Sequence, residues 1–319
     1  MIETYNLGEY IRSARPILDE VIMDYTKKSD KFYLISPDMT RAAFPQFMNA
    51  CSERNINVGI AETAAVDIAS GMALEGFLPY VYGMSAFLSM RSFEAIRTNV
   101  GYQNHNVKFI ACNTGVSLGM LGSTHYAMED LALVSTIPNM TVICPGDPDQ
   151  TVKAFYAAAE MEGPVYIRMA NGKNESAVYK SQDYKFEIGK GITIREGEDL
   201  ALIACGVMVS YANEAAKRLA EQGINATVID MHTIKPLDEE LVLKVAKNIG
   251  KIVTVEDHFK ACGLGTKVAS IVAEEGLACK VKKLGIPDMY PGFGPFKDHL
   301  EYMGYGTDAI IEAAKEIVK

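Results

Sequence analysis

Continuous apolar runs alternate with segments of helical periodicity along most of this chain of 319 residues. In the first half, segments such as 62–76 and 147–161 carry the helical spacing and separate the apolar runs. Strands that are apolar on both faces and alternate with helices indicate a mainly parallel sheet covered on both sides. We therefore predict an α/β fold, with first-half strands at 31–36, 78–83, 107–113, 140–144 and 165–169.

The pattern changes after Asn171, where a polar, turn-rich stretch predicts a linker leading into a short hairpin. A second alternation of strands and helices then begins at Asp199. We predict two domains with mainly parallel sheets, at 1–175 and 191–319, joined by a linker at 176–190. The strands expected in the second domain lie at 199–205, 225–231, 251–257 and 278–286.

The composition excludes several classes of function. A formal net charge of −9, without any block of Lys or Arg, argues against binding to nucleic acid. No window approaches the roughly 20 apolar residues of a membrane span, and the acidic N-terminal stretch does not predict a signal peptide. The six cysteines lie far apart and the histidines are not clustered, so we expect reduced thiols in a cytoplasmic protein and no metal site in this chain.

Three polar features follow predicted strands, which is where ligands bind in open α/β sheets. Glu62 follows the apolar run 57–60. His125 ends a Gly-rich loop that begins at Asn113, and Arg168 lies at the end of another strand. Each has a plain alternative: an acid at a helix start complements the dipole, a histidine can cap a helix, and an arginine can form a structural ion pair. Their convergence at one sheet edge favours a functional site.

A fourth feature is the spacing of Phe87, Met90 and Phe93, which recur at i, i+3 and i+6. This spacing predicts that the three side chains share one face of a helix. Such an apolar stripe is ordinarily core. It becomes a shelf for a cofactor only where a flat heterocycle packs against it.

Five segments occur in an order typical of one protein family: GIAETAAVDIASGMALEGFLPYV, SAFLSMRSFEAIR, GSTHYAMEDLALVSTIPNMTVICPGDP, GPVYIR and TVEDHFKACGLGTKVA. The first four resemble the pyrimidine-binding domain of transketolases, and the fifth resembles their C-terminal domain. The resemblance covers essentially the whole chain. It extends in weaker form to deoxyxylulose-phosphate synthases and to the beta subunits of 2-oxoacid dehydrogenases.

Transketolases bind thiamine diphosphate with two domains, and a Gly-Asp-Gly…Asn motif in an N-terminal domain holds the diphosphate and its metal. No Gly-Asp-Gly occurs here, because Gly146-Asp147 is followed by Pro148. The resemblance therefore implies the C-terminal subunit of a split transketolase, incomplete without a partner subunit that carries this motif and holds Mg²⁺ or Ca²⁺. It also implies a heterotetramer and ketol transfer between sugars or sugar phosphates.

The resemblance assigns roles to the residues near the cofactor. Glu62 is implied to contact the N1′ nitrogen of the aminopyrimidine and to share a proton with it, in a site that the subunit interface and the neighbouring apolar residues desolvate. Phe87 is implied to stack on the pyrimidine, with Met90 and Phe93 lining the pocket. Asp38 matches an Asp near the cofactor and the subunit interface.

The substrate-binding positions depart in part from the family pattern. His125 is implied to hydrogen-bond substrate oxygens, and Arg168 to grip a sugar phosphate with its planar fork. Leu121 stands where an Asp usually reads a substrate hydroxyl, and Asn113 stands where a phosphate-binding His is usual. Because polar sites discriminate strongly among hydroxyl groups, we expect a phosphate-poor, sulfonated or otherwise modified sugar.

Two other kinds of function stay open at the level of sequence. The first is a beta subunit of a 2-oxoacid dehydrogenase, or a carboligase similar to deoxyxylulose-phosphate synthase. The second is a non-catalytic binding homologue that keeps the fold. The loop STHYAMEDLALVSTIPNM matches transketolases better than the dehydrogenases, and the retention of Glu62 and His125 argues against a non-catalytic homologue.

Overall fold

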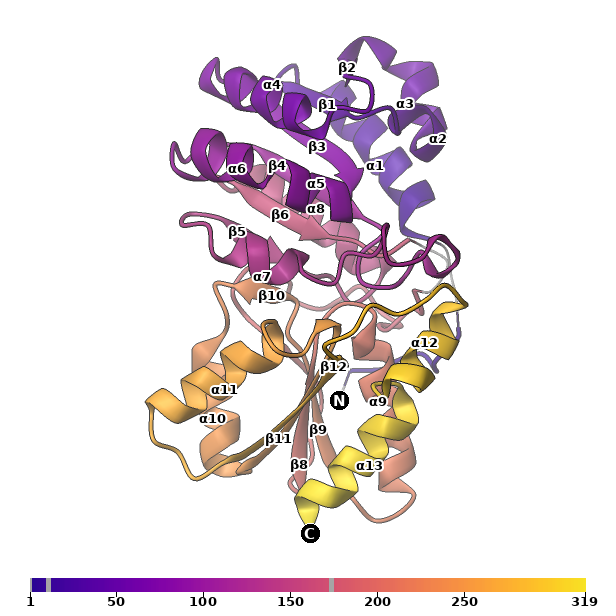
Figure 1. Cartoon of the computed structure of the whole chain (residues 1–319), viewed down its shortest axis with the longest axis vertical. Helices are drawn as coiled ribbons and strands as arrows, with labels where there is room; N and C mark the ends of the chain where they lie inside the picture. Colours follow the sequence, from indigo (N-terminus) through magenta and orange to yellow (C-terminus); the bar gives the residue numbers. More distant parts are fainter. Residues whose placement is uncertain (1, 10–12, 172–174) are drawn as a thin grey trace.

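The computed structural model describes residues 2–9, 13–171 and 175–319, and it contains two sheets, one above the other in Figure 1. The first sheet consists of β1 (Phe32–Ser36), β2 (Asn55–Asn57), β3 (Leu78–Met84), β4 (Lys108–Cys112), β5 (Thr141–Ile143), β6 (Val165–Arg168) and β10 (Thr233–Lys235). Its order is β10-β5-β6-β4-β3-β1-β2. All of its pairings among the described residues are parallel except that of β10 with β5.

Helices cover both faces of the first sheet, as its apolar strands require. On one face α1 (Ala14–Lys28), α3 (Pro45–Ala50) and α8 (Pro148–Glu160) pack on Phe32, Tyr80 and Ile110. The other face carries α4 (Glu62–Leu74), α5 (Ser85–Arg91), α6 (Phe93–Ala95) and α7 (Asp130–Ser135). Short α2 (Thr40–Ala43) precedes α3. Asp147 caps α8, since its side chain accepts the backbone N–H of Gln150 at 2.8 Å.

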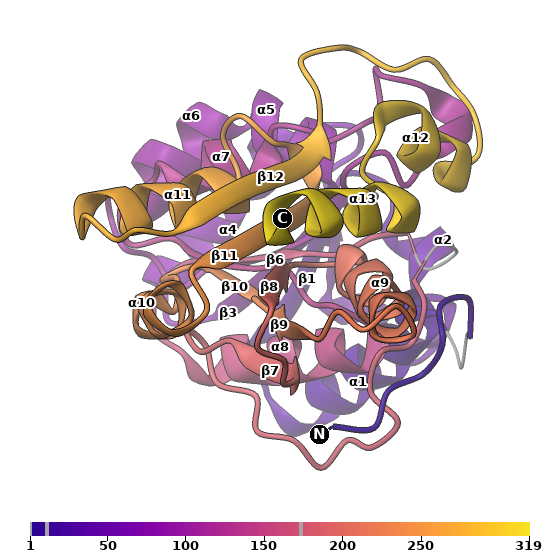
Figure 2. The same cartoon turned by 90° about the horizontal axis from the view of Figure 1, so that it is seen from below.

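The second sheet has the order β12-β11-β8-β9-β7. Its strands are β7 (Ile192–Arg195), β8 (Leu200–Ala204), β9 (Ala226–Asp230), β11 (Lys251–Phe259) and β12 (Lys280–Ile286). One face packs on α9 (Met208–Ala220), α12 (Phe296–Met303) and α13 (Thr307–Val318), and the other on α10 (Glu239–Asn248) and α11 (Leu264–Glu274), as Figure 2 shows from below. The predicted two-domain α/β fold with mainly parallel sheets is thereby confirmed.

Two local predictions are wrong. The run 57–60 is not a strand: the strand is β2, at 55–57, and the chain then turns at Gly59 with a φ of 71°. Ile60 is 80% exposed, so it does not help to bury Glu62. The expected hairpin after the linker is also wrong, because β7 pairs antiparallel with β9 rather than with a neighbour in sequence.

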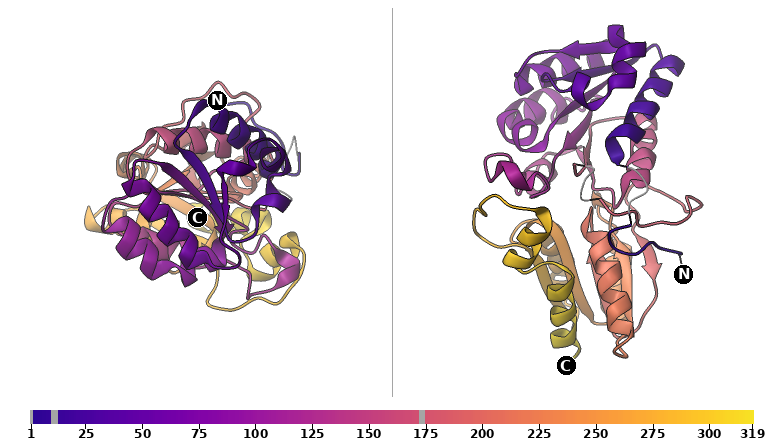
Figure 3. Two further views of the ribbon diagram at one scale, coloured as in Figure 1. Left: turned by 90° about the horizontal axis from the view of Figure 1, so that it is seen from above. Right: turned by 90° about the vertical axis from the view of Figure 1, so that its right-hand side faces the viewer.

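Two segments cross the domain limits expected from the sequence, and those limits stay a prediction. Strand β10 belongs to the second half of the chain but pairs with β5 of the first sheet. The N-terminal residues lie beside the second domain (Figure 3), where Asn213 donates to Thr4 Oγ1 at 3.0 Å and Lys217 donates to the carbonyl of Tyr5 at 2.9 Å. Within the described ranges, no helix is long and apolar enough to cross a membrane.

Candidate active site

Most of the candidate residues lie just after the carboxyl ends of strands in the first sheet. The chain leaves β3 directly into α5, which carries Phe87, and it leaves β4 into the loop that holds Asn113, Leu121 and His125. Glu62 is the first residue of α4. Because the carboxyl ends of parallel strands lie at one edge of a sheet, these elements meet there.

Four of the side chains form a connected group. Glu62 is 5% exposed, and its Oε2 lies 3.4 Å from Nη1 of Arg91, whose side chain is 57% exposed. The Arg91 guanidinium lies 4.5 Å from the centroid of the Phe87 ring. The ring of His125 meets Phe87 edge-on, with 5.3 Å between the centroids. The structure therefore brings Glu62, Phe87 and His125 together and adds Arg91 to them.

Helix α5 explains why Phe87 and Arg91 act on the same site. Residues four apart lie on the same face of a helix, and Phe87 and Arg91 have this spacing. The predicted single face for Phe87, Met90 and Phe93 is wrong, because the helix is interrupted at Ser92 and Phe93 begins α6. Phe93 packs partly against the hydrophobic core, whereas Met90 is 43% exposed.

Asp38 lies apart from this group, in the turn after β1. It is exposed, it has a left-handed φ of 57°, and its Oδ1 accepts a hydrogen bond from Asn57 Nδ2 at 2.8 Å. The two residues thus hold the turns after β1 and β2 together. The predicted role of Asp38 beside a cofactor stays a prediction.

Arg168 forms the structural ion pair that the sequence left open as an alternative. It is 4% exposed, and its Nε donates to both carboxylate oxygens of Asp130, at 2.9 and 3.1 Å. Its Nη2 donates to the carbonyl oxygens of Ala127 (3.2 Å) and Asp257 (2.9 Å). Asp257 lies on β11, so the guanidinium bridges the two domains. The geometry favours this structural role over the predicted grip on a sugar phosphate.

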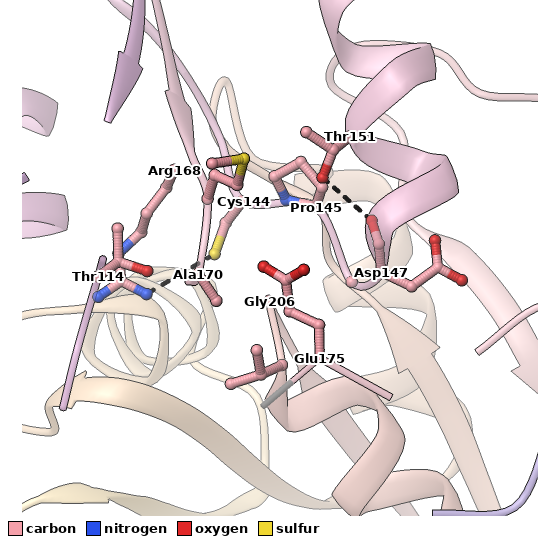
Figure 4. A pocket seen from close by; sticks show the side chains of 12 residues that line it. Thr114, Cys144, Pro145, Asp147, Thr151, Arg168, Ala170, Glu175 and Gly206 are labelled. Carbon is pink, nitrogen blue, oxygen red and sulfur yellow. Dashed lines mark hydrogen bonds between the residues drawn. The ribbon is translucent and has the colours of Figure 1, made fainter. Parts of the chain in front are cut away.

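A small cavity lies beside Arg168, between the domains. Figure 4 shows Cys144, Glu175 and Gly206 among the residues that line it. Its volume of about 10 Å³ is room for about one water molecule. A sugar cannot enter it.

Asp130 is the buried partner on which this network depends. Burial alone would raise the pKa of its carboxyl, but the charge of Arg168 and the hydrogen bonds from Arg168 and Ser85 bring the pKa below its ordinary value. Ser85 is the first residue of α5 and donates to Asp130 at 2.9 Å. The ion pair therefore also fixes the start of the helix that carries Phe87 and Arg91.

Replacing Arg168 by Met should lower the free energy of unfolding by about 3–5 kcal/mol, because the Asp130 carboxylate would stay buried without a cation. The Arg54→Gln variant is the control: Arg54 pairs with the fully exposed Asp30, and such pairs contribute about 0–1 kcal/mol. Denaturant unfolding measures both. Since the folded pKa of Asp130 is depressed, the stabilisation is present at neutral pH and lost as the pH falls through that pKa. Equal losses in the two variants would contradict this role for Arg168.

A separate open pocket of about 410 Å³ contains two of the predicted substrate residues, Asn113 and Leu121. Asn113 is buried and accepts a hydrogen bond at 2.8 Å from Nη2 of Arg15, near the start of α1. The Nε of Arg15 is buried and has no hydrogen-bond partner among the described residues. Leu121 is 52% exposed at the rim.

Sequence reasoning missed Arg15 and Arg91. Arg91 could have been found, because it lies four residues after Phe87 on a predicted helix. Arg15 lies 98 residues from Asn113, and no local pattern signals that contact. In the part of the chain that the structure describes, no group of three or more His, Cys, Asp and Glu side chains is arranged to hold a metal ion.

The fold and the site together define a class of protein: two α/β domains, with a buried carboxylate and an aromatic ring at the carboxyl edge of the first sheet. Comparison with known proteins gives the family. The transketolase pyrimidine binding domain model matches residues 12–175, and the transketolase C-terminal domain model matches residues 189–310. The chain belongs to the transketolase family.

Three relatives of similar length match over most of their chains. A putative transketolase C-terminal section from Methanocaldococcus jannaschii is 36% identical over 98% of each chain. The SqwH subunit of a 6-deoxy-6-sulfo-D-fructose transketolase from a Clostridium species is 34% identical over 94% of this chain and 92% of that one. One subunit of an apulose-4-phosphate transketolase from Phocaeicola vulgatus is 36% identical over 83% of this chain and 84% of that one.

A solved structure described as a split gene transketolase, an inactive beta4 tetramer, matches with a TM-score of 0.85. It is 34% identical, and the match covers 98% of this chain and 99% of that one. This chain is accordingly a transferase subunit of the split transketolase type.

Proposed function

We propose that this chain contributes the pyrimidine side of a ketol-transfer site that is completed by a partner subunit and that uses thiamine diphosphate. One observation carries the proposal: a buried carboxylate, Glu62, and a half-buried aromatic ring, Phe87, share contacts with one arginine at the carboxyl edge of the sheet. Two helices, α4 and α5, meet to make this arrangement.

These residues fit the aminopyrimidine of thiamine diphosphate. Arg91 is the one polar partner of the Glu62 carboxylate among the described residues, so Oε1 keeps the capacity to bind a ring nitrogen. Phe87 offers a flat apolar surface on which a heterocycle packs. When bound, thiamine diphosphate supplies the nucleophilic carbon that carries a two-carbon unit between substrates.

Each residue then has a defined task. Glu62 holds the pyrimidine nitrogen and shares a proton with it, while Phe87 orients the ring. Met90 and Phe93 line the pocket beyond Phe87. The Nδ1 of His125 is bonded to Thr124 Oγ1 at 2.9 Å, which leaves Nε2 to hydrogen-bond a substrate oxygen.

A partner subunit is supported by the surface around the site. Ile60 and Met90 are 80% and 43% exposed. Along the sequence, Ile60 lies two residues before Glu62, and Met90 lies directly before Arg91. Exposed apolar side chains that surround a functional group are typical of an interface. We propose that this partner carries the Gly-Asp-Gly…Asn motif, holds the diphosphate with Mg²⁺ or Ca²⁺, contacts Asp38 and forms a heterotetramer with this chain.

A cytoplasmic location is part of the proposal and rests on the cysteines. All six are free thiols, and four of them are buried. Free thiols of this kind persist in reducing compartments.

The substrate pocket supports a sugar whose far end carries at most one charge. Arg15 lines the pocket and supplies one guanidinium, and Arg168 is occupied by Asp130. A phosphate carries about −1.5 to −2 charges near pH 7, whereas a sulfonate carries one. We propose that the substrate is a sulfonated or otherwise phosphate-poor sugar, as in the SqwH relative, and that the apolar Leu121 replaces a hydroxyl-reading group.

The test is turnover by the complex of this chain with its partner. We expect 6-deoxy-6-sulfofructose to be a better ketol donor than xylulose 5-phosphate with ribose 5-phosphate as acceptor. The Arg15→Met variant should lose roughly 10- to 100-fold in kcat/KM for the sulfonated donor, since hydrogen bonds to charged groups contribute about 1.5–3 kcal/mol. The same variant should change little with the neutral ketose erythrulose.

The Arg54→Gln variant serves as the control for loss of a positive charge, because Arg54 pairs with exposed Asp30 and neither residue lines the pocket. Turnover of xylulose 5-phosphate above that of the sulfonated donor would contradict the proposed substrate class. Absence of ketol transfer with any sugar would contradict the proposed function itself.

A further inference from the structure

The second domain reaches the candidate substrate pocket. Gly294, Pro295 and Phe296 line the pocket on the side contributed by the second domain, and Arg15 and Asn113 line it from the first. Residues 291–296 follow β12 and lead into α12. We call this segment the C-terminal wall.

Hydrogen bonds attach the C-terminal wall to the loop that carries Leu121 and His125. The Tyr126 hydroxyl lies within hydrogen-bond distance of the carbonyl oxygens of Gly119 and Gly292 and of His299 Nε2. The Gly294 N–H donates to the Gly119 carbonyl at 3.0 Å. The Ser123 hydroxyl donates to the carbonyl of Pro291. Tyr126 is only 1% exposed, so this contact is built into the fold.

The backbones of the two segments also approach closely. A Cβ atom on Gly119 would lie 2.3 Å from the carbonyl oxygen of Gly294, and Gly119 has a φ of +25°. Any other residue would force the segments apart, because such a distance is far inside van der Waals contact. The position of the C-terminal wall and the position of the Leu121 loop are therefore coupled.

Phe293 lies on the outer part of this wall. Its side chain is 76% exposed, and its Cβ is 3.8 Å from the place where a Cβ on Gly122 would stand. Leu121, the adjacent residue, is 52% exposed. Phe293 immediately precedes Gly294, and Leu121 immediately precedes Gly122; Gly294 and Leu121 line the same pocket as Arg15 and Asn113. Two exposed apolar side chains therefore flank the point where the C-terminal wall and the Leu121 loop approach each other beside this pocket.

We propose that the C-terminal wall selects the substrate and that Phe293 packs against the carbon chain of a sugar held at its far end by Arg15. The inference rests on the proposed function for the reaction and adds the second domain to the residues that determine specificity. Aromatic rings bind the C–H faces of sugars through apolar contact, and such contact requires the exposure that Phe293 has. Leu121 contributes the matching apolar surface from the first domain.

A fluorine label tests this placement without relying on turnover. The chain has no tryptophan, so the Phe293→Trp variant grown with fluorotryptophan gives a single fluorine resonance even in a complex with an unlabelled partner. We expect a saturable shift of that resonance on addition of 6-deoxy-6-sulfofructose or xylulose 5-phosphate. The matched control is Tyr102→Trp, at a position that is 83% exposed and precedes β4 at the opposite edge of the sheet; its resonance should not move.

Kinetics give an independent readout. The Phe293→Ala variant should raise KM about 10-fold, the factor expected for losing much of one buried aromatic contact, and change kcat by less than about 2-fold. An unshifted resonance with a sugar that the complex binds, or an unchanged KM, overturns the proposal. If the wild-type complex binds sugars with the expected shift but transfers no ketol unit, the C-terminal wall is supported and the proposed reaction is contradicted. If no sugar binds at all, both are overturned.

Discussion

Turnover by the reconstituted complex should fall by roughly 100- to 10,000-fold when Glu62 is replaced by Gln, the range expected for loss of a positioned acid–base group. Gln keeps the size of the side chain but cannot share a proton with a ring nitrogen. The variant should fold, because the carboxylate makes only one polar contact among the described residues, to the exposed Arg91. Steady-state rates at saturating cofactor measure the loss.

Helix α4 provides the matched control for this variant. Asp67 is an exposed carboxylate on the same helix and accepts a hydrogen bond from Asn99 at 2.8 Å. Asp67→Asn makes the same chemical change at a position that does not contact Arg91, Phe87 or His125. It should leave turnover within about 2-fold of the wild-type value, as expected for a surface substitution. Unchanged turnover in the Glu62→Gln variant would contradict the proposed role of Glu62 in proton transfer.

The strands of the first sheet could be predicted from the sequence because they are buried on both faces. The runs at 31–36, 78–83, 107–113, 140–144 and 165–169 each overlap a strand of the structure, to within one residue at either end. β2 could not be placed in this way. It is an edge strand with the sequence Asn-Ile-Asn, and the apolar run that follows it lies in an exposed turn.

Strand β10 shows a second limit of local patterns. It has three residues, and its partner β5 lies in the other half of the chain. Its extended conformation depends on pairing with residues about 90 positions earlier in the chain, such as Ile143 opposite Thr233. No pattern within the strand itself indicates that pairing. The pairing of β7 with β9 likewise joins strands that are not consecutive in the sequence, so the local pattern wrongly predicted a hairpin.

The candidate site divides along similar lines. Glu62, Phe87 and His125 follow strand ends or begin helices, so topology alone predicts that they converge. Arg168 is the last residue of β6, but its partner Asp130 could not be identified from the sequence. Burial of that pair changes the interpretation of Arg168 from a ligand-binding group to a structural one.

We propose that this chain holds only part of a cofactor site. We propose that Glu62 and Phe87 hold the pyrimidine; the chain has no Gly-Asp-Gly motif, and its described residues offer no metal-binding cluster. In the proposed function, the partner supplies the ligands of the diphosphate and its metal. If the partner completes the site as we propose, the loss on separating the two chains should exceed that of any single substitution.

Mixing the separately purified chains is the most direct test of this claim. Calorimetric titration of thiamine diphosphate with Mg²⁺, together with an assay of ketol transfer, should be run on this chain, on the partner and on the mixture. We expect tight binding and turnover only in the mixture, and no measurable ketol transfer by this chain alone. Tight cofactor binding and turnover by this chain without the partner would contradict the account.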